Sequence, residues 1–243
     1  MNYTCCIITI MSILNNKSLW IAAPLFLCDL ALIALYFYFG PGVKLFDLDL
    51  ERNIPTYYQG FQLIFAASLI FTVLTFLYLI RAFKSWQLWL LFPYWLGFVY
   101  LALDEVGFIH ESLHGLMSSI FGGEEQLLVY ERTFTTLGYT STEWLLFYWP
   151  AILASAAYFI YLIYFFRKRT QVNMWLLCLA VACFFVSPVL EFYTTSTKFS
   201  DDVWIKLVAT EEFAEMVGVT LFIVLNFQYL QILIEKTRQK FLV

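Results

Sequence analysis

The stretch that decides the fold is WQLWLLFPYWLGFVY (Trp86–Tyr100), which continues directly into LALDEVGFIHESLH (Leu101–His114). The first part contains no charged residue. The second part places five titratable, metal-ligating residues within fourteen positions, and they include both histidines of the chain: Asp104, Glu105, His110, Glu111 and His114. Carboxylates and imidazoles at the end of a lipid-soluble helix are costly, so these groups require partners, protons or a metal ion.

The composition places the whole chain in a membrane. Of the 243 residues, 62% are hydrophobic and 13% are charged, whereas a soluble domain has about 25% charged residues. Apolar runs of near 20 residues recur, and they are continuous rather than alternating, which indicates helices that span a bilayer. The net charge of -4 argues against nucleic acid as a partner. We therefore expect an all-α integral membrane bundle whose partners are membrane lipids.

Six transmembrane helices are predicted in one domain covering residues 1–243. Their expected ranges are 18–40, 61–80, 86–108, 143–166, 172–193 and 205–233.

The basic residues predict the orientation of these spans. Nine of the fourteen fall in short loops and tails on one side: Lys17, Arg81, Lys84, Arg167, Lys168, Arg169, Lys236, Arg238 and Lys240. By the positive-inside rule that side is cytoplasmic, which puts both termini inside the cell.

In this orientation, four spans bring acids to a similar depth near the outer surface. These acids are Asp104, Glu105 and Glu111 at the third span, Glu143 at the fourth, Glu191 at the fifth, and Glu211, Glu212 and Glu215 at the sixth. We expect the chain to fold so that these groups meet in an outward-facing pocket. The alternative is that the acids only collect near outer loops.

The spacing of the pocket residues suggests a divalent metal site. Glu111 and His114 are spaced i, i+3, as in the Glu-x-x-His ligand pairs of di-iron bundles, and His110 and His114 are spaced i, i+4. Glu212-x-x-Glu215 could supply a second pair. The expected ligands are His110, Glu111, His114, Glu191, Glu212 and Glu215, and such mixed oxygen and imidazole ligands suit iron, manganese or zinc.

Two other interpretations of the acids stay open. One is a hydrogen-bonded structural cluster, neutralised by Lys206, Arg52 or Arg132. The other is a proton or ion path, for which Asp29 is the best evidence because it lies near the middle of the first span. A carboxyl group at mid-membrane is a functional candidate by default. Asn226 is a second polar residue deep in a span.

The order of the motifs resembles an uncharacterised group of bacterial multipass inner-membrane proteins. The resemblance is carried by Glu51-Arg52-Asn53-Ile54-Pro55-Thr56, by Asp104-Glu105 and His110-Glu111, by Glu191, and by Glu211-Glu212-x-x-Glu215-Met216. It covers most of the chain after about Pro41. It implies a location in the bacterial plasma membrane and no particular activity, and it adds Glu51 and Arg52 to the pocket.

The leading functional hypothesis is a metal-dependent enzyme with its site on the outer, periplasmic side, acting on a lipid-like or amphipathic substrate. In that scheme Asp104 or Glu105 is a general base or a partner of a metal ligand, and Glu211 lines the pocket. The alternatives are a cation or proton transporter and a non-catalytic membrane assembly subunit.

Overall fold

The computed structural model describes residues 16–40, 43–48, 52–81, 85–107, 109, 143–169, 173–196 and 199–241. Side chains are described for these residues except 16, 17, 19, 85, 143–149, 168, 169, 191, 192, 194–196, 240 and 241.

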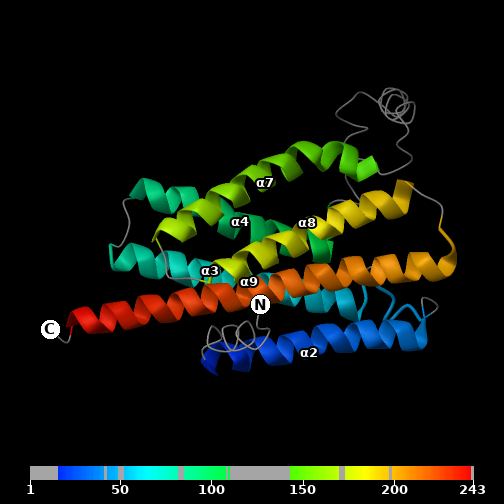
Figure 1. The fold of residues 1–243 in the computed structure, drawn as a ribbon, viewed down its shortest axis with the longest axis horizontal. Coiled ribbons are helices and arrows are strands. Elements are labelled where there is room, and N and C mark those ends of the chain that lie inside the picture. The colour runs from blue at the N-terminus through cyan, green and yellow to red at the C-terminus, as the bar shows by residue number, and fades with distance from the viewer. Residues whose placement is uncertain are drawn as a thin grey trace, which may run out of the picture.

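The described chain forms six helices and no strand, as predicted (Figure 1). They are α2 (Asn16–Phe39), α3 (Ile54–Leu79), α4 (Ser85–Gly107), α7 (Glu143–Arg169), α8 (Met174–Ser196) and α9 (Asp201–Phe241). Five of them are long and apolar enough to cross a membrane, and the apolar part of α8, Met174–Leu190, is shorter.

Helix α9 is the central element of the bundle. It packs against α2, α3 and α8, while α4 packs on α3 and α7 packs on α8. Its 41 residues correspond to about 60 Å at 1.5 Å per residue, and its C-terminal end extends beyond the other helices (Figure 1).

Successive helices alternate in direction along the bundle (Figure 1). The C-terminal ends of α4 and α8 therefore lie at the same end of the molecule as the N-terminal ends of α3, α7 and α9. This arrangement brings the elements that carry Asp104, Glu191 and Glu211 to one end, which is what the expected pocket requires.

The core is an aromatic cluster centred on Phe222 of α9, which is fully buried. Its ring lies 5.9 Å from Tyr94, 5.1 Å from Phe98, 5.8 Å from Phe159 and 5.4 Å from Phe184, centroid to centroid. Tilted and edge-to-face contacts at these distances are favourable for aromatic rings. One side chain of α9 thus joins α4, α7 and α8.

Two glycines allow neighbouring helices to approach closely. A Cβ atom at Gly60 of α3 would lie 2.6 Å from the Val106 side chain of α4. A Cβ atom at Gly218 of α9 would lie 3.0 Å from the Phe184 ring of α8. Small residues serve this purpose at helix interfaces in membranes.

The motif that precedes the second span is the N-terminal cap of α3. The backbone N–H and the hydroxyl of Thr56 donate to Asn53 Oδ1 at 3.1 and 3.0 Å, and the Asn53 amide donates to the carbonyl of Asp47. Pro55 lies in the first turn, where its missing N–H costs nothing. The capping explains why α3 begins at Ile54, earlier than residue 61.

Candidate functional site

Asp29 of α2 lies at the centre of a buried polar cluster formed by three helices. Its Oδ1 accepts from the Tyr58 hydroxyl and from Gln62 Nε2, both at 2.8 Å, and its Oδ2 accepts from the Thr220 hydroxyl at 3.0 Å. Asp29 and Gln62 are fully buried. Tyr58 and Gln62 come from α3 and Thr220 comes from α9, so the carboxyl group joins α2 to both neighbours.

The partners of Asp29 can serve either protonation state of the carboxyl group. The Tyr58 hydroxyl has one hydrogen and two acceptors in reach, Asp29 Oδ1 at 2.8 Å and the Leu25 carbonyl at 2.9 Å. It can donate to an ionised Asp29, or donate to Leu25 while accepting from a protonated Asp29. The Thr220 hydroxyl has the same freedom, because a hydroxyl both donates and accepts.

The hydrogen bonds of Gln62 are unbalanced, because its donor faces too many acceptors and its acceptor has no donor. Its Nε2 has two hydrogens and lies within 3.0 Å of three oxygens, those of Asp29, Tyr58 and Thr220. Its Oε1 is buried and has no hydrogen-bond partner among the described atoms. A buried acceptor without a donor costs roughly 1–3 kcal/mol, so this oxygen marks a place where a further group would be stabilised.

A second polar cluster lies toward the end of the bundle at which α9 begins. The Ser187 hydroxyl of α8 donates to Glu215 Oε1 and lies 3.5 Å from Glu211 Oε1. Gln59 of α3 donates to Glu215 Oε2. Two of the predicted pocket acids, Glu211 and Glu215, therefore meet at one serine hydroxyl.

The two clusters are adjacent along α3 and α9. Gln59 and Gln62 are spaced i, i+3, which separates them by about 4.5 Å along α3. Glu215 and Thr220 are separated by about 7.5 Å along α9. The contacts from Gln59 to Glu215 and from Gln62 to Thr220 make a polar ladder at this helix interface. The ladder runs from Glu215 toward the carboxyl group of Asp29.

Asp104 and Glu105 lie half-buried in the last turn of α4. A Cβ atom at Gly60 would be 3.9 Å from Glu105 Cγ, and Gly60 follows Gln59, which binds Glu215. Glu105 thus packs against α3 one residue from Gln59. Glu212 is also half-buried, on the same turn of α9 as Glu211.

Several predicted pocket residues lie outside the described part of the chain. These are Glu51, His110, Glu111 and His114, together with the side chains of Glu143 and Glu191. Arg52 is described and is exposed, with a left-handed backbone φ of 62°. Among the described residues, no group of three or more His, Cys, Asp or Glu side chains could hold a metal ion.

The polar groups of the other half of the bundle are separated from the ladder by the Phe222 cluster. Asn226 donates to the Tyr94 hydroxyl at 2.8 Å, and Gln228 donates to the Ser18 hydroxyl at 3.3 Å. Both pairs are bonded side chain to side chain and lie further along α9 than Phe222. Asn226 is buried, with 2% of its surface exposed.

Sequence reasoning singled out Asp29 but missed its partners. The signal was present, because Gln59 and Gln62 lie one helical turn apart in an otherwise apolar helix, and Thr220 and Ser187 interrupt apolar runs. Polar side chains within such segments usually face the bundle interior. The missed residues are Tyr58, Gln59, Gln62, Ser187 and Thr220.

The fold and the two clusters define a class of protein: an apolar helical bundle, compatible with a membrane, with polar groups packed inside it. The chain belongs to the family described as a domain of unknown function (DUF8692), whose model matches residues 18–229. That description fits the uncharacterised group that the motifs resemble and specifies no activity. The searches of curated proteins and of solved structures each found no match.

Proposed function

We propose that this chain is a multipass protein of the bacterial plasma membrane that binds and moves a small cation, with Asp29 as the cation-binding carboxyl group. The observation that carries the proposal is the buried Asp29 cluster, in which one carboxyl group in the middle of α2 is held, among the described residues, by the neutral partners Tyr58, Gln62 and Thr220.

The cost of burying this carboxyl group argues for a function. An ionised carboxylate that is removed from water without a paired cation is strongly unfavourable. A proton or a bound cation removes that cost. A site that is neutral only when it is occupied is suited to pick up a cation on one side and release it on the other.

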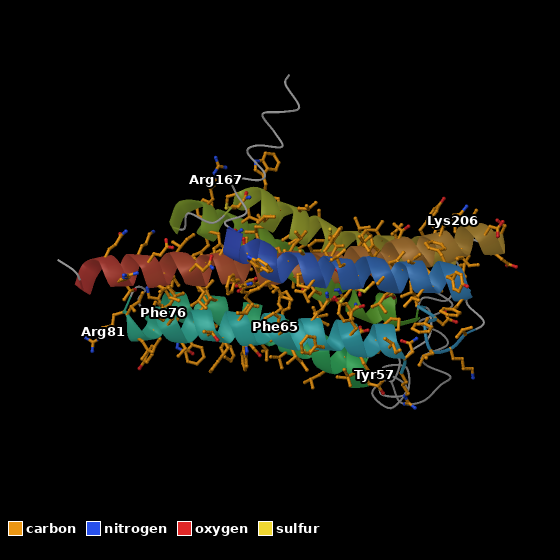
Figure 2. All side chains as sticks on the ribbon, turned by 90° about the horizontal axis from the view of Figure 1, so that it is seen from below. Tyr57, Phe65, Phe76, Arg81, Arg167 and Lys206 are labelled. Atoms are coloured by element: carbon orange, nitrogen blue, oxygen red, sulfur yellow. The ribbon has the colours of Figure 1, made fainter. Side chains whose placement is uncertain are left out.

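The outer acids give such a site an entrance. We assign Glu211 and Glu215 to the mouth of the path, where negative charge attracts cations, and the ladder of Gln59 and Gln62 to its continuation. The orientation follows from the basic residues. Figure 2 shows Arg81 and Arg167 toward the end where the C-terminus of α9 lies, with Lys206 and Tyr57 toward the opposite end.

The test is cation flux in liposomes that contain the purified full chain. A potassium gradient with valinomycin drives proton uptake, which a trapped pH dye reports, and labelled sodium is followed in parallel. We expect flux from the wild type and at least a tenfold loss in Asp29→Asn, which keeps the shape of the side chain and removes its charge. Asp202→Asn, an equal charge change at an exposed position of α9, is the matched control.

Equal flux in the wild type and in Asp29→Asn would contradict the proposal. A folded wild type with no flux of either ion would leave the assembly-subunit interpretation in its place.

A divalent metal site at the outer cluster is the second candidate. The observation that favours it is the convergence of Glu211 and Glu215 on the Ser187 hydroxyl, because carboxylate and hydroxyl oxygens are metal ligands. We propose that Glu212 and Glu215, with His110, Glu111, His114 and Glu191, would hold iron, manganese or zinc. The hypothesis that the chain is a metal-dependent enzyme acting on a lipid-like substrate requires this metal site.

Metal content decides the second candidate. Mass spectrometry of protein purified in mild detergent without chelators should find stoichiometric metal in the wild type and a loss in the Glu111→Gln, Glu212→Gln double variant. Absence of metal from both samples, or equal metal in both, would reject the assignment.

A further inference from the structure

We infer that the Asp29 site takes a sodium ion in exchange for a proton. The inference rests on the proposed function and names the ion of that same site.

The oxygens around Asp29 form a ligand set for a small, hard cation. Besides the two carboxylate oxygens, the cluster offers the hydroxyls of Tyr58 and Thr220 and the carbonyl of Leu25, each within 3.0 Å of a neighbouring member. Hard cations prefer oxygen ligands of this mixed kind, in which carboxylate, hydroxyl and carbonyl groups combine. The oxygens come from α2, α3 and α9, and Asp29 and Thr220 are buried.

The orphan oxygen of Gln62 distinguishes sodium from a proton. Its Oε1 shares one carbon atom with Nε2, which lies 2.8 Å from Asp29 Oδ1, so Oε1 belongs to a group that is directly hydrogen-bonded to the same carboxylate. A proton on Asp29 would neutralise the carboxyl group but would leave this buried acceptor without a partner. A cation both neutralises Asp29 and takes Oε1 as a ligand.

Charge and size select a monovalent ion that is smaller than potassium. One carboxylate neutralises one positive charge, whereas a divalent ion would leave an uncompensated buried charge. The Tyr58 oxygen lies 2.8 Å from Asp29 Oδ1 and 2.9 Å from the Leu25 carbonyl oxygen, and so compact a set of ligand oxygens suits a small ion better than a large one.

Protons and sodium then compete for one carboxyl group. The contacts of Asp29 come from Tyr58 and Gln62 on α3 and from Thr220 on α9. Of these, Tyr58 is the titratable group, and Cys28 is the adjacent titratable residue on α2. Asp29 is therefore the acidic group of the cluster, and lower pH should weaken sodium binding.

The test is the reaction of Asp29 with dicyclohexylcarbodiimide, which modifies protonated carboxyl groups in apolar surroundings. The purified full chain in mild detergent is labelled at fixed pH in choline, potassium or sodium chloride, and mass spectrometry quantifies the peptide that contains Asp29. Sodium at ten times its dissociation constant should slow labelling by about elevenfold through competition, whereas potassium should not. Sodium should also raise the unfolding temperature of the same sample.

Two variants localise the effect. Gln62→Leu and Thr220→Val should each keep the labelling of Asp29 and shift sodium protection to at least tenfold higher concentrations, while Asp29→Asn should lose the label. Should a variant fail to fold, the wild-type titration alone decides.

The outcomes separate the inference from the proposed function. Labelling and unfolding temperature that do not respond to sodium overturn the sodium inference, and Asp29-dependent proton flux in the same preparation would show that the proposed function survives. Sodium protection that both variants retain in full would overturn the assigned ligands. If Asp29 is never labelled and the chain shows no cation flux, both the sodium inference and the proposed function are rejected.

Discussion

The carboxyl group of Asp29 depends on neutral hydrogen-bond donors from other helices. Bonds to a charged group contribute more than neutral bonds, about 1.5–3 kcal/mol each, so Tyr58, Gln62 and Thr220 together offset much of the cost of burial when the group is ionised. These bonds lower the cost of ionising Asp29 but supply no positive charge. A structural ion pair, by contrast, would contain a permanent cation.

Gly60 provides a residue-level test of the α3–α4 contact. Gly60→Ala places a Cβ atom 2.6 Å from the branched side chain of Val106, so overpacking of about 1–3 kcal/mol should exceed the gain in helix propensity. We expect a lower unfolding temperature in detergent. Gly97→Ala, whose added Cβ atom meets nothing within 4 Å, is the control and should be neutral or slightly stabilising. Equal effects of both changes would contradict the close approach.

At the residue scale, the sequence revealed which groups are costly but not which groups meet. Asp29 was identifiable because a lone acid in an apolar span stands out. Its contacts with Gln62 and Thr220 depend on how α2, α3 and α9 are rotated about their axes, and the hydropathy pattern of an almost wholly apolar helix does not determine that rotation.

The ends of the helices depend on capping and on exposed turns. The starts and ends of α2, α4, α7 and α8 were predicted within a few residues because apolar runs determine them. The start of α3 was missed because its first turns are polar and are held by the Asn53 cap. Helix α9 runs from Asp201 to Phe241 rather than over 205–233 because polar turns extend it at both ends.

Two substitutions of Asn53 separate its role as the cap of α3 from its hydrogen bond to the carbonyl of Asp47. Asn53→Ala removes the acceptor for Thr56 and the donor to Asp47, and loss of the cap alone costs about 1 kcal/mol. Asn53→Asp keeps the acceptor and loses only the donor. We expect the free energy of unfolding to fall more for alanine than for aspartate, with faster amide exchange at Thr56. Equal losses in the two variants would show that the bond to Asp47, not the cap, holds the start of α3.

For the whole molecule, α9 organises both the packing and the polar path. Its Phe222 holds the aromatic core, while Glu211, Glu215 and Thr220 contact α8, α3 and α2 in turn. These contacts wind around α9 and end before Phe222. A cation that reaches Asp29 must pass this aromatic layer to leave on the other side, so we expect transport to require movement of α9 relative to α4 and α8.

The placement of the acid-bearing helix ends at one end of the bundle was predictable from helix order alone, because helices that alternate in direction bring every second terminus together. The contacts of Glu215 with Ser187 and Gln59 were not predictable, since neither partner is charged. The predicted ligands His110, Glu111 and His114 stay a prediction.

The most direct test of the central claim is infrared difference spectroscopy of the reconstituted chain during exchange of sodium for choline and during a pH titration. We predict a protonated-carboxyl band that appears as sodium is removed or the pH is lowered. The band should be absent from Asp29→Asn and unchanged in Asp202→Asn. Identical difference spectra from the wild type and Asp29→Asn would contradict the claim that Asp29 is the exchanging group.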